Sequence, residues 1–148
     1  MGIDKNEILN PQVCKIEILH TSSIDTYTYG TTRQYRAITL LTGKAWLLVY
    51  SSPGTPIFKE EGKQESAGTV FTQTVEFLYP GDSVLSREDL FSLDQMHFVV
   101  RLTFNNGLKK LIGSPDNPAQ FQVTFSTEKG GYLMTFACRS AEPAFLTT

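Results

Sequence analysis

Residues 98–107 read Phe-Val-Val-Arg-Leu-Thr-Phe-Asn-Asn-Gly, and this stretch decides the fold class. Successive side chains of a β-strand point to opposite faces, so apolar residues at every second position predict a half-buried strand. The even-numbered positions from Phe98 to Phe104 are all apolar and are expected to face inward. Val99, Arg101 and Thr103 are expected to face outward.

The dipeptide Asn106-Gly107 follows this strand almost directly. Asn-Gly is a strong signal for a two-residue hairpin turn, because both residues accept positive φ. A turn of that length would pair Asn105 with Leu108 and set Leu102 opposite Leu111 on one face. The stretch therefore predicts an antiparallel sheet.

Period-two patterns and turn residues recur along the rest of the chain. They predict a mainly β fold of about eight strands in one domain over residues 1–148, either a two-layer β-sandwich or a barrel-like sheet. One short helix over residues 83–95 is expected to flank the sheet (α+β), and residues 1–12 are expected to form an N-terminal arm. The other expected strands cover residues 14–18, 35–41, 44–50, 57–61, 70–79, 121–125 and 132–139.

The expected strand at 44–50 differs from the others because both of its faces are apolar. Trp46, Leu48 and Tyr50 alternate with Ala45, Leu47 and Val49. Two explanations remain open: a central strand that is covered on both sides, or a strand that gives one face to a partner.

Residues 57–70 are expected to form a projecting hairpin, with a turn at 62–68. Its tip is densely charged and has no apolar residue to anchor it, so we expect it to lie in solvent or against a neighbouring subunit. An ordinary solvated surface loop is the alternative. The candidate subunit contacts are Lys59, Glu60, Glu61, Lys63 and Glu65.

Three tyrosines lie in or beside the polar, Thr-rich stretch 21–32. Tyr27, Tyr29 and Tyr35 are candidates for aromatic recognition of a sugar or a peptide, since aromatic rings offer a large apolar face with a polar end. The alternative is that they cover the edge of the sandwich.

The overall composition argues against two kinds of partner. The chain has 13 Lys and Arg against 15 Asp and Glu, and its basic residues are scattered, so we expect no nucleic-acid partner. No apolar run approaches the ~20 residues that a membrane helix needs, and the start lacks the apolar segment of a signal peptide. We therefore expect no membrane partner and a protein that is cytoplasmic at synthesis.

Cys14 and Cys138 are the two cysteines. Each follows the alternation of apolar neighbours, so both are expected to be buried thiols, and nothing in the sequence requires a disulfide between them.

The sequence holds no convincing catalytic or metal-binding motif. His20 stands near Ser22, which allows a Ser–His pair, but a surface histidine at a strand end is the preferred interpretation, also for His97. Glu60 and Glu61 are adjacent, so on a strand they point to opposite faces and do not form an acid–base pair. No cluster has the ligand spacing of a zinc or calcium site. We expect no enzyme activity, no metal and no cofactor.

A family resemblance is carried by the sequence of residues 98–118, together with Gly131–Phe136 and Glu142–Phe145. In these stretches the chain resembles small structural proteins encoded by tailed phages and prophages of gut Bacteroidetes. The likeness includes the charged segment 59–68 and Pro80-Gly81, and covers residues 57–146. It implies a non-enzymatic virion component of the tail or neck, which contacts other copies of itself or other virion proteins. By fold analogy it also implies a tail-tube type of β-sandwich with a flanking helix and a long arm.

Overall fold

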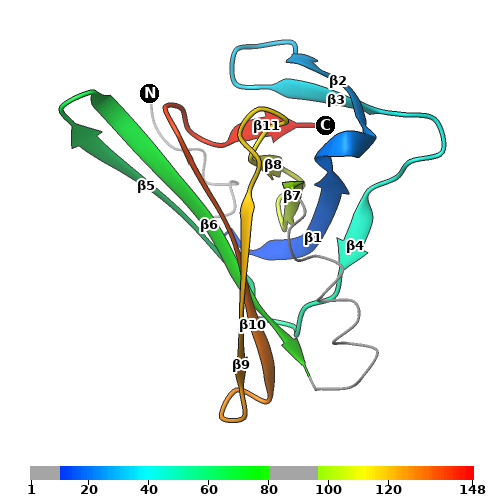
Figure 1. The fold of residues 1–148 in the computed structure, drawn as a ribbon, viewed down its shortest axis with the longest axis vertical. Helices are drawn as coiled ribbons and strands as arrows, with labels where there is room; N and C mark the ends of the chain where they lie inside the picture. Colours follow the sequence, from blue (N-terminus) through cyan, green and yellow to red (C-terminus); the bar gives the residue numbers. More distant parts are fainter. Residues whose placement is uncertain (1–10, 81–96) are drawn as a thin grey trace.

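The computed structural model describes residues 11–80 and 97–148 and confirms a mainly β protein (Figure 1). Those residues form eleven strands rather than the expected eight, because several short strands lack a clear alternation in the sequence. The helix expected at 83–95 and residues 1–10 of the expected arm lie outside the described residues. The strands are β1 Val13–His20, β2 Ile24–Tyr29, β3 Arg36–Leu40, β4 Leu47–Val49, β5 Ile57–Glu65, β6 Gly68–Pro80, β7 Phe98–Phe104, β8 Lys109–Ile112, β9 Gln120–Ser126, β10 Gly131–Ser140 and β11 Phe145–Thr147.

These strands form three antiparallel sheets, and the sheets do not close into a barrel. One sheet has the order β11-β8-β7-β1-β4, and a second has the order β5-β6-β10-β9. The third is the two-stranded ribbon β2-β3. Strands β4, β5, β9 and β11 therefore stand at sheet edges within the described part of the chain.

The core lies between the five-stranded and the four-stranded sheet. The five-stranded sheet contributes the even-numbered side chains of β7, as the alternation predicts, together with Ile16 and Ile18 of β1. Aromatic rings join the two layers: Phe98 meets Phe136 edge to face at 6.2 Å between ring centroids, and Phe58 meets Phe104 at 5.8 Å. The four-stranded sheet adds Val75, Phe77, Tyr132, Met134, Phe136 and Cys138.

The opposite face of the five-stranded sheet is also largely buried, which corrects the expectation for Val99. Val99 and its cross-strand partner Leu19 are almost fully buried, as is Leu111. A period-two pattern marks a strand with one polar face, and here tertiary packing covers both faces of β7.

The hairpin after β7 has a different register from the one expected. Thr103 pairs with Lys109 and Leu102 with Lys110, so the loop Asn105–Gly107 has three residues rather than two. The Phe104 N–H donates to the Leu108 carbonyl, and Gly107 has a positive φ of 86°. A three-residue loop that ends in a left-handed glycine is the next most common hairpin connection. The shift moves Leu111 to the face opposite the core and brings Ile112 into the core.

The first cysteine is exposed, which corrects the expectation that both are buried. The register between β1 and β7 skips one residue between Val13 and Lys15, so Cys14 occupies a bulge and leaves the alternation of Ile16 and Ile18. Cys138 is buried in the core, and neither cysteine forms a disulfide.

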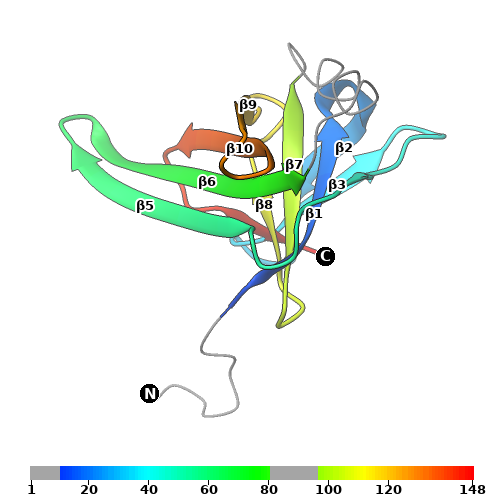
Figure 2. The same ribbon diagram turned by 90° about the horizontal axis from the view of Figure 1, so that it is seen from below.

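The paired part of the β5–β6 hairpin is longer than expected, and its turn is shorter. The pairing continues from Ile57–Glu76 to Glu65–Gly68, so only Ser66 and Ala67 form the turn. In Figure 2 the two strands run as a curved ribbon whose turn lies away from the other strands. The charged residues of the expected tip therefore belong to an edge strand.

Candidate functional site

A pocket of about 480 Å³ opens between the β2-β3 ribbon, the 113–117 loop and the segment that precedes β11. In β2, Tyr27 and Tyr29 are two residues apart and so share one face, and Tyr29 stands directly opposite Arg36 of β3. We call this the aromatic–arginine pocket; its walls include Tyr27, Tyr29, Arg36, Asn117, Glu142 and Phe145.

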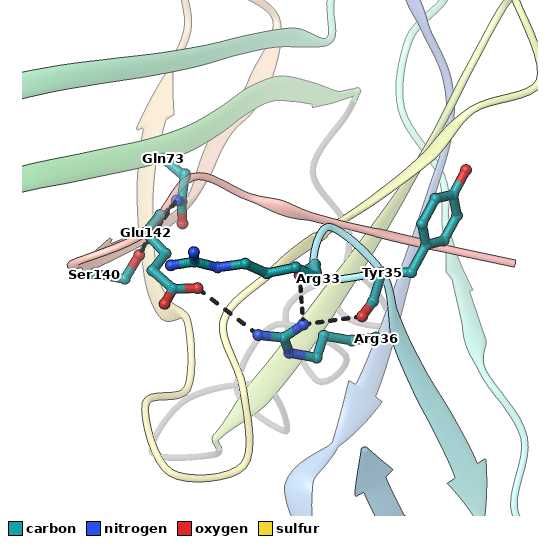
Figure 3. A network of polar contacts seen from close by, with 6 residues as sticks. All are labelled: Arg33, Tyr35, Arg36, Gln73, Ser140 and Glu142. Atoms are coloured by element: carbon teal, nitrogen blue, oxygen red, sulfur yellow. Dashed lines mark hydrogen bonds and ion pairs between the residues drawn. The ribbon is translucent and has the colours of Figure 1, made fainter. Parts of the chain in front are cut away.

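Arg36 is the positively charged group that lines this pocket and is only 8% exposed. Its guanidinium carbon lies 4.2 Å from the centre of the Tyr29 ring and 3.6 Å from that of Phe145. Nη1 donates to the carbonyls of Arg33, at 2.8 Å, and Tyr35, at 2.9 Å (Figure 3). A buried guanidinium is tolerated because aromatic rings cover its faces and carbonyl oxygens accept hydrogen bonds from its N–H groups.

Glu142 provides the negative charge that faces Arg36, with Oε2 3.7 Å from Nη2. The backbone of Glu142 is held separately: its carbonyl accepts hydrogen bonds from Gln73 Nε2, at 3.1 Å, and from the Ser140 hydroxyl. The next residues are fixed by Glu60, whose Oε2 accepts the Ala144 N–H. Side chains from β3, β5, β6 and β10 thus position one wall of the pocket. Figure 3 shows those of Arg36, Gln73 and Ser140.

The hydroxyl of Tyr27 is buried and makes no hydrogen bond of normal geometry with the described residues. Burial raises the pKa of Tyr27, and the nearby Arg36 guanidinium opposes this shift without cancelling it. Buried hydroxyls are normally paired, and the polar group that acts on this one is the Arg36 guanidinium.

The structure brings two of the three predicted tyrosines together. Tyr27 is half-buried, and Tyr29 is 76% exposed on the side that Arg36 does not cover. Tyr35 does not line the pocket and contributes only its carbonyl to Arg36. No pattern in the sequence indicates Arg36 and Phe145 as pocket residues, because they meet only in the tertiary fold.

The five charged residues predicted as subunit contacts all lie in β5. Glu60 is used within the chain through Ala144, and Glu65 forms an exposed ion pair with Arg139 Nη2 at 3.3 Å. Lys59, Glu61 and Lys63 are exposed and form no ion pair with the residues that the structure describes.

Strand β4 is an edge strand that pairs only with β1 among the described strands, so the central position considered for 44–50 is wrong. Leu47, Leu48 and Tyr50 are each 60% exposed. Trp46 is half-buried against Arg101, whose guanidinium carbon lies 4.3 Å from the ring centre. Burial against the residues that the structure describes therefore does not explain the apolar character of this strand.

The candidate catalytic residues do not assemble into a site. His20 Nδ1 lies 2.9 Å from the Ser22 hydroxyl, but this contact is on the exposed surface. His97 is exposed as well, and its carbonyl accepts the Thr21 N–H. Glu60 and Glu61 are neighbours in β5 and point to opposite faces. Within residues 11–80 and 97–148, no group of three or more His, Cys, Asp or Glu side chains is placed to hold a metal ion.

No protein-family model, curated protein or solved structure matches this chain. Among the described residues, no helix has the length and apolar character needed to cross a membrane.

Proposed function

We propose that this chain is a non-enzymatic structural protein that acts through contacts with other copies of itself or with other virion proteins, as a tail or neck component of a phage or prophage. The virion assignment rests on the sequence resemblance. The assembly role rests on the surface of the molecule.

The observation that carries the assembly role is the apolar edge at β4. Leu47 and Leu48 are neighbours on a strand, so they point to opposite faces, and both are mostly exposed. Natural sheet edges are usually charged, covered or closed, because an open edge is a template for another chain. Residues 45–50 have no charge, and exposed apolar patches on soluble proteins mark interaction sites.

The experiment is sedimentation velocity over a range of concentrations. The wild type is expected to form larger species as its concentration rises. The double variant Leu47→Lys with Leu48→Lys is expected to remain smaller, because two charges at the edge oppose contact with another chain. Leu108→Lys is the control, since Leu108 is also an exposed leucine but directly follows the β7–β8 loop.

Two results would contradict the assembly role. One is a wild type that sediments as a monomer at every concentration reached and binds no other virion protein of its phage. The other is a β4 variant that assembles as the wild type does.

A second candidate function, a ligand-binding module for a glycan or a peptide, is favoured by the aromatic–arginine pocket. Tyr29 offers an exposed ring face, and Tyr27 and Arg36 add polar groups to the same wall. Aromatic faces with a few convergent polar groups are typical of small-ligand sites.

This candidate is tested on arrays of glycans and short peptides. Tyr29→Ala is expected to remove the stacking surface and binding with it, whereas Tyr27→Phe removes only one hydroxyl and should weaken binding. Tyr35→Phe, outside the pocket, is the control. A wild type that binds no glycan or peptide above background rejects this function.

A further inference from the structure

Strand β5 is the open edge of the four-stranded sheet. It pairs with β6 on one side, and no other strand within residues 11–80 and 97–148 pairs with its outer side. Every residue of β5 is exposed except the half-buried Phe58. The strand is nine residues long, so it presents a long row of backbone groups to solvent (Figure 2).

The turn determines which backbone groups are free. The hairpin closes at the Glu65–Gly68 pair through a two-residue turn, so this pair directs its N–H and C=O groups toward β6. Alternation along the strand leaves the N–H and C=O groups of the even-numbered residues, from Phe58 to Gln64, pointing to the open edge. Phe58 packs against the core, and Glu60 accepts a hydrogen bond from the Ala144 N–H. The even-numbered side chains of β5 therefore lie on the face of the strand that is directed toward the core.

The odd-numbered side chains form the opposite face, which begins with the apolar Ile57. We call its four charged residues the β5 outer face: Lys59, Glu61, Lys63 and Glu65. Their charges alternate in sign along the strand. An edge with charges of one sign repels every copy of itself, whereas alternating charges attract in some registers and repel in others.

One antiparallel register satisfies all four charges. When Gly62 stands opposite Gly62 of a second copy, Lys59 faces Glu65 of the second copy and Glu61 faces Lys63. Symmetry repeats both pairs. A displacement by two residues in one direction sets Lys59 against Lys63, and in the other direction it sets Glu61 against Glu65. A displacement by one residue places the free N–H and C=O groups of one copy opposite residues of the other copy whose own N–H and C=O groups are already bonded to β6.

Gly62, at the centre of this register, has no side chain on the crowded side of the strand. A Cβ there would meet the Phe71 ring at 2.9 Å, because Phe71 of β6 stands opposite and covers the glycine. Glycine within a strand often marks the close approach of another backbone.

We infer that β5 pairs antiparallel with β5 of a second copy of this chain, with Gly62 at the two-fold axis, to join two four-stranded sheets into one. This inference rests on the proposed assembly function and names the partner and the register. A two-fold contact of this kind uses the same surface on both subunits. Backbone hydrogen bonds hold the strands together, and the charge pairs select the register. Glu65 exchanges its exposed partner Arg139 for Lys59 of the second copy.

The first test makes the β5 outer face uniform in charge. The variant Lys59→Glu with Lys63→Glu has only acidic residues there, and Glu61→Lys with Glu65→Lys has only basic ones. Each variant alone is expected to raise the dissociation constant of the dimer at least tenfold in sedimentation equilibrium at low salt. A 1:1 mixture is expected to restore association. Self-association of both variants at the wild-type level, or a mixture that stays monomeric, overturns the inference.

The second test probes the register and does not depend on the charge variants folding. In a Cys14→Ser background, chains with Glu61→Cys and chains with Lys63→Cys are mixed and oxidised. A disulfide-linked heterodimer is expected in the mixture and little product from either variant alone. Equal product from each variant alone overturns the register.

Different results would contradict the β5 pairing and the proposed assembly function. If the β4 variant reduces assembly while the uniform-charge β5 variants associate like the wild type, the β5 inference falls and the proposed function stands. If the wild type does not associate at all and binds no virion protein, both fall.

Discussion

The guanidinium carbon of Arg36 lies 3.6 Å from the centre of the Phe145 ring, so a side chain of β3 is stacked directly on one of β11. The two residues are far apart in the sequence, and their contact closes the wall of the aromatic–arginine pocket. We therefore expect the stability of the fold and the shape of the pocket to depend on the same stack.

Replacement of this arginine is expected to be costly even when the charge is kept. Arg36→Lys retains a cation but loses the planar group that stacks on two rings and bonds two carbonyls. We expect the free energy of unfolding to fall by about 2 kcal/mol, measured by urea denaturation. Arg33→Lys, at an exposed neighbouring position, is expected to change it by less than about 0.5 kcal/mol. Equal stabilities of the two variants would show that the stack contributes little.

The ion pair of Glu17 and Arg101 gives a second prediction. Arg101 donates from Nη2 and Nε to the same carboxylate oxygen, at 2.9 and 3.1 Å, and Glu17 is only 7% exposed. A double-mutant cycle with Glu17→Gln and Arg101→Met is expected to give a coupling free energy of about 1–3 kcal/mol. The exposed Lys15, 3.8 Å from the same carboxylate, is expected to couple to Glu17 by less than about 1 kcal/mol. A larger coupling for Lys15 than for Arg101 would contradict this assignment.

The two cysteines are expected to differ in reactivity. Cys14 is exposed in its bulge, whereas Cys138 is buried and burial raises the pKa of its thiol. A thiol reagent reacts with the thiolate, so Cys14 should be modified first in the folded protein and Cys138 only after unfolding. Mass spectrometry of partly labelled protein measures the order. Labelling of Cys138 at the rate of Cys14 would show that the core opens readily.

Stability is expected to decrease at alkaline pH. Burial raises the pKa of Cys138 above its ordinary value of 9.0 and that of Tyr27 above 10.0, so the folded chain keeps protons that the unfolded chain has begun to lose. Their contribution is fully present below the unfolded pKa values and is lost as the pH rises through the folded ones. Urea denaturation from pH 7 to about 11 measures this loss. Cys138→Ala should flatten the first part of the decline, and an unchanged profile in this variant would assign the decline to other groups.

The strands with one polar face were predictable from the sequence. The even-numbered residues of β7 face the core, as their alternation indicates, and β10 follows the pattern of residues 132–139 closely. Predictions from the alternation of apolar residues were wrong where a bulge or a longer loop shifted the strand register by one residue. Cys14 is exposed because of the bulge in β1, and Leu111 left the core because the loop at Asn105–Gly107 has three residues.

The candidate binding surfaces were predictable only in part. The sequence indicated Tyr27 and Tyr29, but not that Arg36 and Phe145 join them in one pocket. It indicated the apolar residues of β4, but not that this strand lies at an edge.

The sequence by itself determined the β character of this protein, the alternating charges of β5 and the apolar faces of its central strands, because these depend on the two-residue period of a strand. The tertiary structure alone decided which strands lie at sheet edges, that both faces of β7 are buried, and which distant residues surround Arg36. Those outcomes depend on contacts between segments far apart in the chain, and no local pattern of side chains specifies such contacts.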